Sequence, residues 1–293
     1  MAKKVNVENK PNHRSMLAEA GVRLLHNRTA MFGLAIFLTI IILCALAGVI
    51  CPEGYDQQDI SKRFLPPGTP GYILGTDNLG RSLLARILYG GRSSLMIGFI
   101  STTLTVVIGV ILGMIAGFYG GTVDDVIMRI LDIFNAIPNL LLAICIAAVF
   151  GGSVTNCILA VGISGIPSTA RMVRGPTLAA KGMEYVESAK SIDASDWVVI
   201  FKHIMPNISS VIIVNFTMGI GGSILIAASL SFLGLGVQPP SPEWGAMLSS
   251  AREFMVKYPY LVSIPGLSIA AVVFSMNLFG DGVRDALDPR LKY

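Results

Sequence analysis

The chain has 293 residues, of which 53% are hydrophobic and only 14% charged, with a formal net charge of +4 at neutral pH. This composition is too apolar for an ordinary water-soluble domain and indicates a membrane protein. The positive charge is not gathered into a basic patch with interleaved aromatic residues, which argues against nucleic-acid binding.

Charge-free apolar runs predict six transmembrane helices, because about 20 helical residues cross the hydrocarbon core of a bilayer. The stretch "FGGSVTN" at 150–156 separates two of them, since it is rich in turn-forming residues. The Gly- and Pro-rich stretch "SFLGLGVQPPSPEWG" after residue 230 cannot stay helical in lipid. We therefore predict an all-α, polytopic fold with helices near 30–51, 94–119, 127–150, 154–172, 207–230 and 259–280.

The distribution of Lys and Arg predicts the orientation. Fifteen of the 22 basic residues fall on the side of the two tails, which the positive-inside tendency assigns to the cytoplasm. The basic segment before the first helix is too long for a signal peptide, so we expect this helix to be a retained anchor. The predicted parts are a cytoplasmic tail (1–29), the first helix (30–51), an external segment (52–93), a transmembrane core (94–280) with a cytoplasmic loop (173–206) and an external loop (231–258), and a cytoplasmic C-terminal tail (281–293).

The cytoplasmic loop contains the densest group of charges, in "ESAKSIDASDWVVIFKHIMP" at 187–206. Its apolar residues fall on one face before "DAS" (193–195) and on one face after it, which predicts two short amphipathic helices joined by a sharp turn. Ser195 can cap the second helix, and Pro206 is expected to begin the fifth span. The residues alone leave two interpretations open, a linker lying on lipid headgroups or a pair of helices that docks in a groove of a soluble partner.

Polar side chains inside the predicted spans either line a solute pathway or form interhelical hydrogen bonds. The strongest pathway candidates are Asn135, Asn139, Asn215 and Asn277, and the wider set adds Asn156, Ser164, Ser168, Ser263 and Ser275. We expect Asp132 to be a helix-end charge that pairs with Arg129.

Catalytic and metal-binding motifs are missing from the sequence. No stretch has the lysine and spacing of a phosphate-binding loop, the three histidines are scattered, and the four cysteines lack paired spacing. We therefore expect no catalytic residues, no metal and no cofactor in this chain. A secondary transporter would need intramembrane charges or an inverted repeat, and a membrane enzyme would need a titratable cluster with catalytic spacing.

The stretch "ESAKSIDASDWVVIFKHIMPN" resembles the E-A-A-x3-G-x9-I-x-L-P loop of ABC-type import permeases. That resemblance implies coupling helices that dock on an ATPase, and it assigns coupling roles to Glu187, Ser188, Ala189, Asp193, Met205 and Pro206. Ser188 and Asp193 depart from the pattern. Asp193 stands where the family has glycine, and Asp is among the few other residues that tolerate a left-handed backbone.

Two further stretches resemble the external segments of peptide- and nickel-import permeases. They are "GTDNLGRSLLARILYGGRSSL" (75–95) and "SFLGLGVQPPSPEWGAML" (231–248), and they point to Gly75, Thr76, Asp77, Gly80, Arg81, Pro239, Pro240, Trp244 and Gly245. The resemblance extends from about residue 20 to the end of the chain.

This resemblance implies the second of two paired permease subunits in a bacterial inner membrane. Its implied partners are a second homologous permease, two cytoplasmic ATPase subunits that bind ATP and Mg, and an external solute-binding protein. The implied cargo is a di- or oligopeptide, with nickel or another small solute as the alternative.

Overall fold

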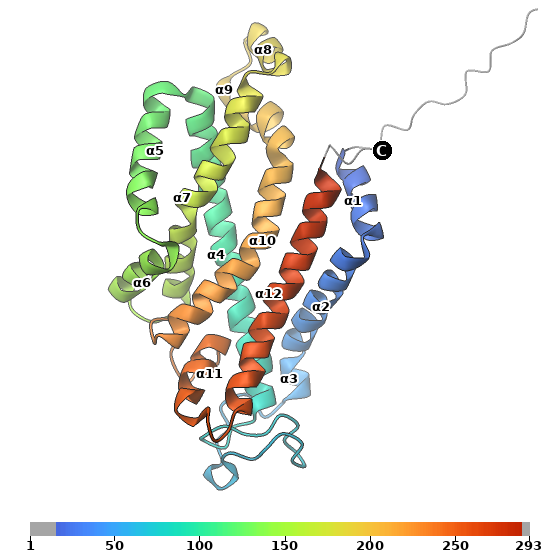
Figure 1. The fold of residues 1–293 in the computed structure, drawn as a ribbon, viewed down its shortest axis with the longest axis vertical. Helices are drawn as coiled ribbons and strands as arrows, with labels where there is room; N and C mark the ends of the chain where they lie inside the picture. The colour runs from blue at the N-terminus through green and yellow to red at the C-terminus, as the bar shows by residue number, and fades with distance from the viewer. Residues whose placement is uncertain (1–15, 289–293) are drawn as a thin grey trace, which may run out of the picture.

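The computed structural model describes residues 16–288, and the side chains from residue 20 onward. Within that range every regular element is a helix (Figure 1). The elements are α1 (Met16–His26), α2 (Arg28–Ala45), α3 (Ala47–Ile50), η1 (Ile60–Lys62), α4 (Leu83–Tyr119), α5 (Gly121–Asn135), α6 (Asn139–Phe150), α7 (Val154–Lys181), α8 (Glu184–Ser191), α9 (Asp196–Val198), the π-helical η2 (Val199–Ile204), α10 (Met205–Phe232), α11 (Trp244–Ala251), η3 (Arg252–Phe254) and α12 (Tyr260–Leu287). The predicted tails lie partly outside the described residues, at 1–15 and 289–293.

The all-α prediction is confirmed, whereas the count of six spans is not. In the described part of the chain, α2, α4, the continuous run 196–232 and α12 are long and apolar enough to cross a membrane. The pair α5 and α6 qualifies only when taken together, which gives four or five candidate spans. α7 is not among them, because polar residues and two internal prolines, Pro167 and Pro176, interrupt its apolar sequence.

The third predicted helix, 127–150, is not continuous. α5 and α6 meet at an angle of 84°, and the break lies between Asn135 and Asn139. Pro138 explains the break, because proline lacks an N–H and its ring disfavours a helical conformation of the preceding Ile137. The second helix also begins earlier than predicted, at Leu83, where the hydroxyl of Ser82 accepts a hydrogen bond from the N–H of Ala85.

A glycine seam joins α4 to α7. A Cβ at Gly109 would lie 2.7 Å from Thr169 Cγ2, one at Gly113 would lie 3.0 Å from Val173 Cβ, and one at Gly117 would lie 2.8 Å from Arg174 O. Small residues at this spacing let two helix backbones approach closely, which is how helices associate in lipid. Interhelical hydrogen bonds reinforce the seam, since Thr105 Oγ1 donates to Gly162 O at 2.6 Å.

The two ends of the molecule differ. The α8–α9 segment forms the tip at one end, and residues 52–82 form a compact cap with α11 at the other end (Figure 1). α1 packs against α12, so the described parts of both termini lie at the end that carries the α8–α9 tip (Figure 1).

Candidate functional site

α8 is held to the body of the protein by one of its faces. Val186 and Ala189 are buried in a cluster with Phe118, Val199 and Ile204, whereas Glu187 and Ser188 are exposed. Glu187 lies in the first turn of α8, where a carboxylate is favoured by the helix dipole, and Lys190 lies in the last turn. Of the predicted coupling residues on α8, Ala189 therefore faces the body of the protein, whereas Glu187 and Ser188 face outward.

The turn after α8 has the left-handed geometry that the sequence predicted at Asp193. Its φ is 59°, Asp193 N donates to Lys190 O at 3.0 Å, and Ala194 N donates to Ala189 O at 3.2 Å. This pair of bonds is the Schellman arrangement that ends many helices, usually with glycine at the left-handed position. It satisfies two carbonyl groups at the end of α8 and fixes the direction in which the chain leaves it.

The second amphipathic helix is not separate from the fifth span. α9, η2 and α10 form one run from Asp196 to Phe232, and Met205 and Pro206, both exposed, lie within it. The proline ring would clash with the carbonyl group of Lys202 in a regular α-helix, and the wider π turn at 199–204 relieves that clash. Ser195 occupies the N-cap position, but its hydroxyl makes no capping hydrogen bond.

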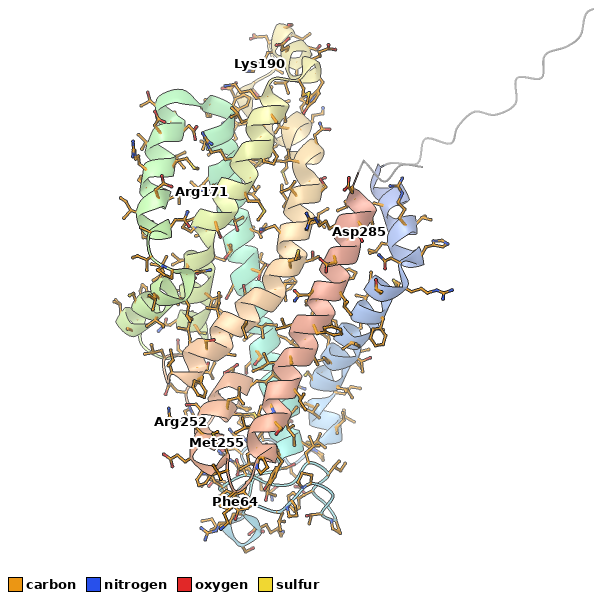
Figure 2. All side chains as sticks on the ribbon, in the orientation of Figure 1. Phe64, Arg171, Lys190, Arg252, Met255 and Asp285 are labelled. Carbon is orange, nitrogen blue, oxygen red and sulfur yellow. The ribbon has the colours of Figure 1, made fainter. Side chains whose placement is uncertain are left out.

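The tip exposes a mixed apolar and acidic surface. Ile192 is 81% exposed and Trp197 57%, and the ring of Trp197 stacks on Phe201 with centroids 5.7 Å apart. Figure 2 shows Lys190 at the same tip, where its ammonium group lies 4.8 Å from the ring centroid of Phe118. Exposed aromatic side chains gathered at this end of the molecule are typical of a protein interaction surface.

The motif "GTDNLGR", predicted to be external, organises the cap. Thr76 is fully buried, and its hydroxyl donates to Lys62 O at 2.5 Å and accepts from Leu65 N at 2.9 Å. Asp77 accepts hydrogen bonds from Leu79 N and Arg81 N through Oδ1 and from Arg81 Nε, at 2.7 Å, through Oδ2. These bonds fold the segment back onto itself.

Two glycines of the cap have left-handed backbones. Gly75 has φ 80° and Gly80 has φ 74°, and a Cβ at Gly80 would lie 2.5 Å from the carbonyl carbon of Asp59. Hydrogen bonds from Ser61 and then from Lys62 hold the pKa of the Asp59 carboxyl below its usual value. Phe64, which also has a positive φ, stacks on Tyr258 with centroids 4.2 Å apart, and Figure 2 shows it at the cap end of the molecule.

The second external motif fixes α11 against the bundle. Trp244 is buried and its Nε1 donates to Ile87 O at 3.0 Å, while a Cβ at Gly245 would lie 2.5 Å from Ala228 Cα. Pro239 and Pro240 are exposed and joined by a cis peptide bond.

Sequence reasoning missed Glu243, which is 1% exposed. It accepts from Ser94 Oγ at 2.9 Å and caps α11 through Ala246 N at 2.9 Å. An acidic residue immediately before a helical run was the available signal.

The pathway candidates lie in three places. Asn135 and Asn139 flank the break between α5 and α6, and both are exposed. Asn215 lines a 590 Å³ cavity with Arg284, and its Nδ2 donates to Met172 Sδ at 3.2 Å. Asn277 lines an apolar cavity of 710 Å³ between α10 and α12.

The other polar residues of these helices have local hydrogen bonds. Asn156 Nδ2 donates to Phe150 O at 2.7 Å, and the hydroxyls of Ser164, Ser168, Ser263 and Ser275 each donate to a carbonyl three or four residues earlier in the chain.

The predicted pairing of Asp132 with Arg129 is wrong. α5 lies beside α7, so Asp132 pairs with Arg171, and the mostly buried Asp124 pairs with Arg174 through both carboxylate oxygens. Figure 2 shows Arg171 on the side of α7 that faces α5. Two ion pairs therefore fasten α5 to α7.

Comparison with known proteins places this geometry in a family. A family model described as the binding-protein-dependent transport system inner membrane component matches residues 109–293, and one described as the N-terminal TM domain of oligopeptide transport permease C matches residues 15–67. The inward-facing MetNI methionine ABC transporter resembles the chain in fold, with a TM-score of 0.58 and 16% identity over 69% of this chain and 96% of that chain.

Curated relatives cover nearly the whole chain. The glutathione transport system permease protein GsiD of Pectobacterium atrosepticum is 45% identical, over 92% of this chain and 90% of its own length. The dipeptide transport system permease protein DppC of Haemophilus influenzae is 45% identical over 91% and 92%. The resemblance drawn from the coupling loop and the external motifs is thus confirmed. The chain belongs to the family of binding-protein-dependent transport system inner membrane components, as a membrane-embedded permease subunit of an ABC importer rather than an enzyme.

Proposed function

We propose that this permease carries short peptides into the cell, as the second of two unlike permease subunits in an ATP-driven importer. The support for the cargo is the agreement among the relatives, whose names specify glutathione, dipeptides or di- and tripeptides. All of these solutes are short peptides, and nothing in the described residues favours nickel. The peptide would be delivered by an external solute-binding protein, and ATP and Mg would be bound by partner ATPase chains.

The α8–α9 tip is the proposed docking site for an ATPase subunit, and it is the observation that carries the mechanism. Glu187 and Ser188 face outward and Trp197 is exposed at the same tip, while Val186 and Ala189 fix the opposite face of α8 to the core. A force on this surface reaches α10 directly, because the run 196–232 is unbroken. Closure of the ATPase dimer would therefore move the membrane helices as packed units.

Both termini are proposed to be cytoplasmic. The described part of α1 and the end of α12 lie at the end of the molecule that carries the tip (Figure 1), and the tails are rich in Lys and Arg. The cap built from residues 52–82 and α11 would then face the solute-binding protein.

The proposed pathway runs past the α5–α6 break. Residues 132–141 are all exposed, and among the described backbone hydrogen bonds none is donated by Asn139, Leu140 or Leu141. Unpaired backbone within a membrane is tolerated only where it lines a water-filled space or is covered by protein. The amides of Asn135 and Asn139 would meet the solute there, and Asn215 and Asn277 would line its route along α10 and α12.

Uptake of a labelled dipeptide tests the proposal in vesicles that contain the complete transporter and its binding protein. Glu187→Lys reverses one charge on the docking surface, and we expect ATP-dependent uptake to fall about tenfold, the equivalent of 1.4 kcal/mol. The matched control is Asp285→Lys, the same reversal at the cytoplasmic end of α12, away from the tip (Figure 2), and it should transport normally.

Two results would contradict the proposal separately. Normal uptake by a correctly inserted Glu187→Lys variant would remove the docking assignment. Uptake of nickel without any uptake of peptide by the wild-type complex would replace the cargo and leave the docking assignment standing.

A further inference from the structure

An apolar groove on the membrane face of the bundle has no role in the functions described above. It lies between α2 and α4, has a volume of 490 Å³ and reaches inward to α10 and α12. On the α2 side it extends from Leu34 to Ala45, about 16 Å at 1.5 Å per residue. Its mouth is formed by side chains that are open to the surroundings, among them Leu38, Met96 and Phe99.

The positively charged side chain of Arg92 lies at one end of this groove. Arg92 is exposed and lies beside Cys44 and Ala45, at the outer end of α2. α2 is interrupted at Leu46, and Arg92 donates from Nε to Cys44 O at 2.7 Å and from Nη2 to Ala45 O at 2.8 Å. The ring of Tyr89 lies 4.9 Å below the guanidinium. These contacts hold Arg92 in place and use two of its five N–H donors, so three remain.

The lining of the groove differs from the helix contacts of the same protein. Where its helices do pack, a glycine meets the neighbouring backbone, as at Gly33, whose Cβ would lie 2.7 Å from Ser275 O. The groove is lined instead by bulky side chains such as Phe37, Leu95 and Phe216. Small residues favour close approach of another helix, whereas long flexible side chains suit a flexible hydrocarbon chain.

We propose that the groove binds an anionic phospholipid, with one acyl chain between α2 and α4 and the phosphate on Arg92. The groove lies within two candidate spans, so lipid is present there at high concentration. Arg pairs with phosphate in a forked geometry, which makes it a strong phosphate ligand. The lipid would fill the space behind α2 and brace this helix against α4 and α12.

Lipid retention by the complete transporter tests the proposal. The complex is incorporated in membranes of phosphatidylglycerol and phosphatidylcholine in equal amounts and purified in mild detergent, and the retained phospholipid is counted by native mass spectrometry. Wild type should retain phosphatidylglycerol in preference. Met96→Trp fills the groove, and we expect retention to fall about tenfold, the equivalent of 1.4 kcal/mol.

The matched control is Ile100→Trp on the same helix. Met96 and Ile100 are similarly exposed, at 46% and 43%, but only Met96 lines the groove. Ile100→Trp should retain lipid as wild type does. Arg92→Gln should retain the two phospholipids equally, since it keeps the groove and loses the cation.

Three outcomes overturn the proposal. Equal retention in Met96→Trp and Ile100→Trp would show that the groove does not hold the lipid. An unchanged lipid preference in Arg92→Gln would remove the phosphate ligand. A photo-reactive residue at position 96 that cross-links to the second permease chain instead of to lipid would make the groove a protein interface.

Discussion

The seam between α4 and α7 and the break between α5 and α6 lie on the same side of the bundle and are built in opposite ways. At the seam, three glycines bring two helices into backbone contact, and interhelical hydrogen bonds join them. At the break, ten consecutive residues from Asp132 to Leu141 are exposed and the helix turns by 84°.

The seam is therefore part of a rigid frame, whereas the segment at the break can change its contacts. Packed helices shift as units because a well-packed contact has few alternative arrangements. An uncovered break with unpaired N–H groups can exchange partners at little cost. Substitutions at the seam, at the two ion pairs between α5 and α7, and at the break test this difference.

Adding a single methyl group to the seam should destabilise the protein. Gly113→Ala places a Cβ 3.2 Å from the carbonyl carbon of Ala170 and even closer to its oxygen, so backbone must move. We expect a loss of about 1–3 kcal/mol in the free energy of unfolding, measured by thermal denaturation of the purified complex. Gly175→Ala on α7 is the control, since nothing lies within 4 Å of its added Cβ and it should be neutral or slightly stabilising.

Removal of the less exposed of the two ion pairs should loosen α5. Asp124→Asn leaves the Arg174 guanidinium without its carboxylate, and we expect a loss of about 1–3 kcal/mol in stability. Asp132→Asn removes an exposed pair between the same two helices and should cost less than about 1 kcal/mol. Thermal denaturation of both variants checks the order, and equal losses would mean that burial does not distinguish the two pairs.

The break should matter for transport more than for stability. Pro138→Ala restores an N–H and favours a straighter helix, so stability should change by less than about 1 kcal/mol. Dipeptide uptake should nevertheless fall several-fold, because the unpaired backbone would no longer line the route. A variant that transports normally would place the pathway elsewhere.

The turn after α8 should accept glycine and reject a β-branched residue. Asp193→Gly removes the Cβ from a left-handed backbone and should stabilise the tip by about 1 kcal/mol or leave it unchanged. Asp193→Val should weaken co-purification of the ATPase, since a β-branched residue at positive φ is strained. If the glycine variant fails as badly as the valine variant, the Asp193 carboxylate contacts the ATPase and the turn is not its role.

Charge-free runs and the motif at 187–206 predicted several helices and the turn at Asp193. Apolar length located both ends of α10 and the starts of α2 and α12 within two residues, whereas α2 ends six residues earlier and α12 seven residues later than predicted. Asp193 was predicted from its place in the motif, because a left-handed turn restricts the residue type at one position. Helix length and turn geometry both depend on residues that are close together in the chain, so they can be predicted from the sequence.

Two of the errors concern contacts between residues that are far apart in the chain. Asp132 was paired with a residue one turn away, but its partner is Arg171, 39 residues further on. Glu243 looked like a loop residue, but it is buried and accepts a hydrogen bond from Ser94, 149 residues earlier. The break at Pro138 was missed for a different reason. Proline after Ile137 is a local signal for the end of a helix, but the surrounding sequence is apolar and was interpreted as one continuous span.

The unbroken run from Asp196 to Phe232 can act as a lever. Its 37 residues form a rod about 55 Å long, at 1.5 Å per residue. A tilt of about 5° moves the end that carries Asp196 by about 5 Å when the other end is fixed, and it moves each end by about 2.5 Å in opposite directions when the pivot lies at the middle. α11 rests on this rod at Ala228, through Gly245. In the orientation proposed above, a displacement of a few ångströms at the ATPase would move α11 by a comparable distance when the pivot lies near the middle of the helix, without any chemical signal passing between them.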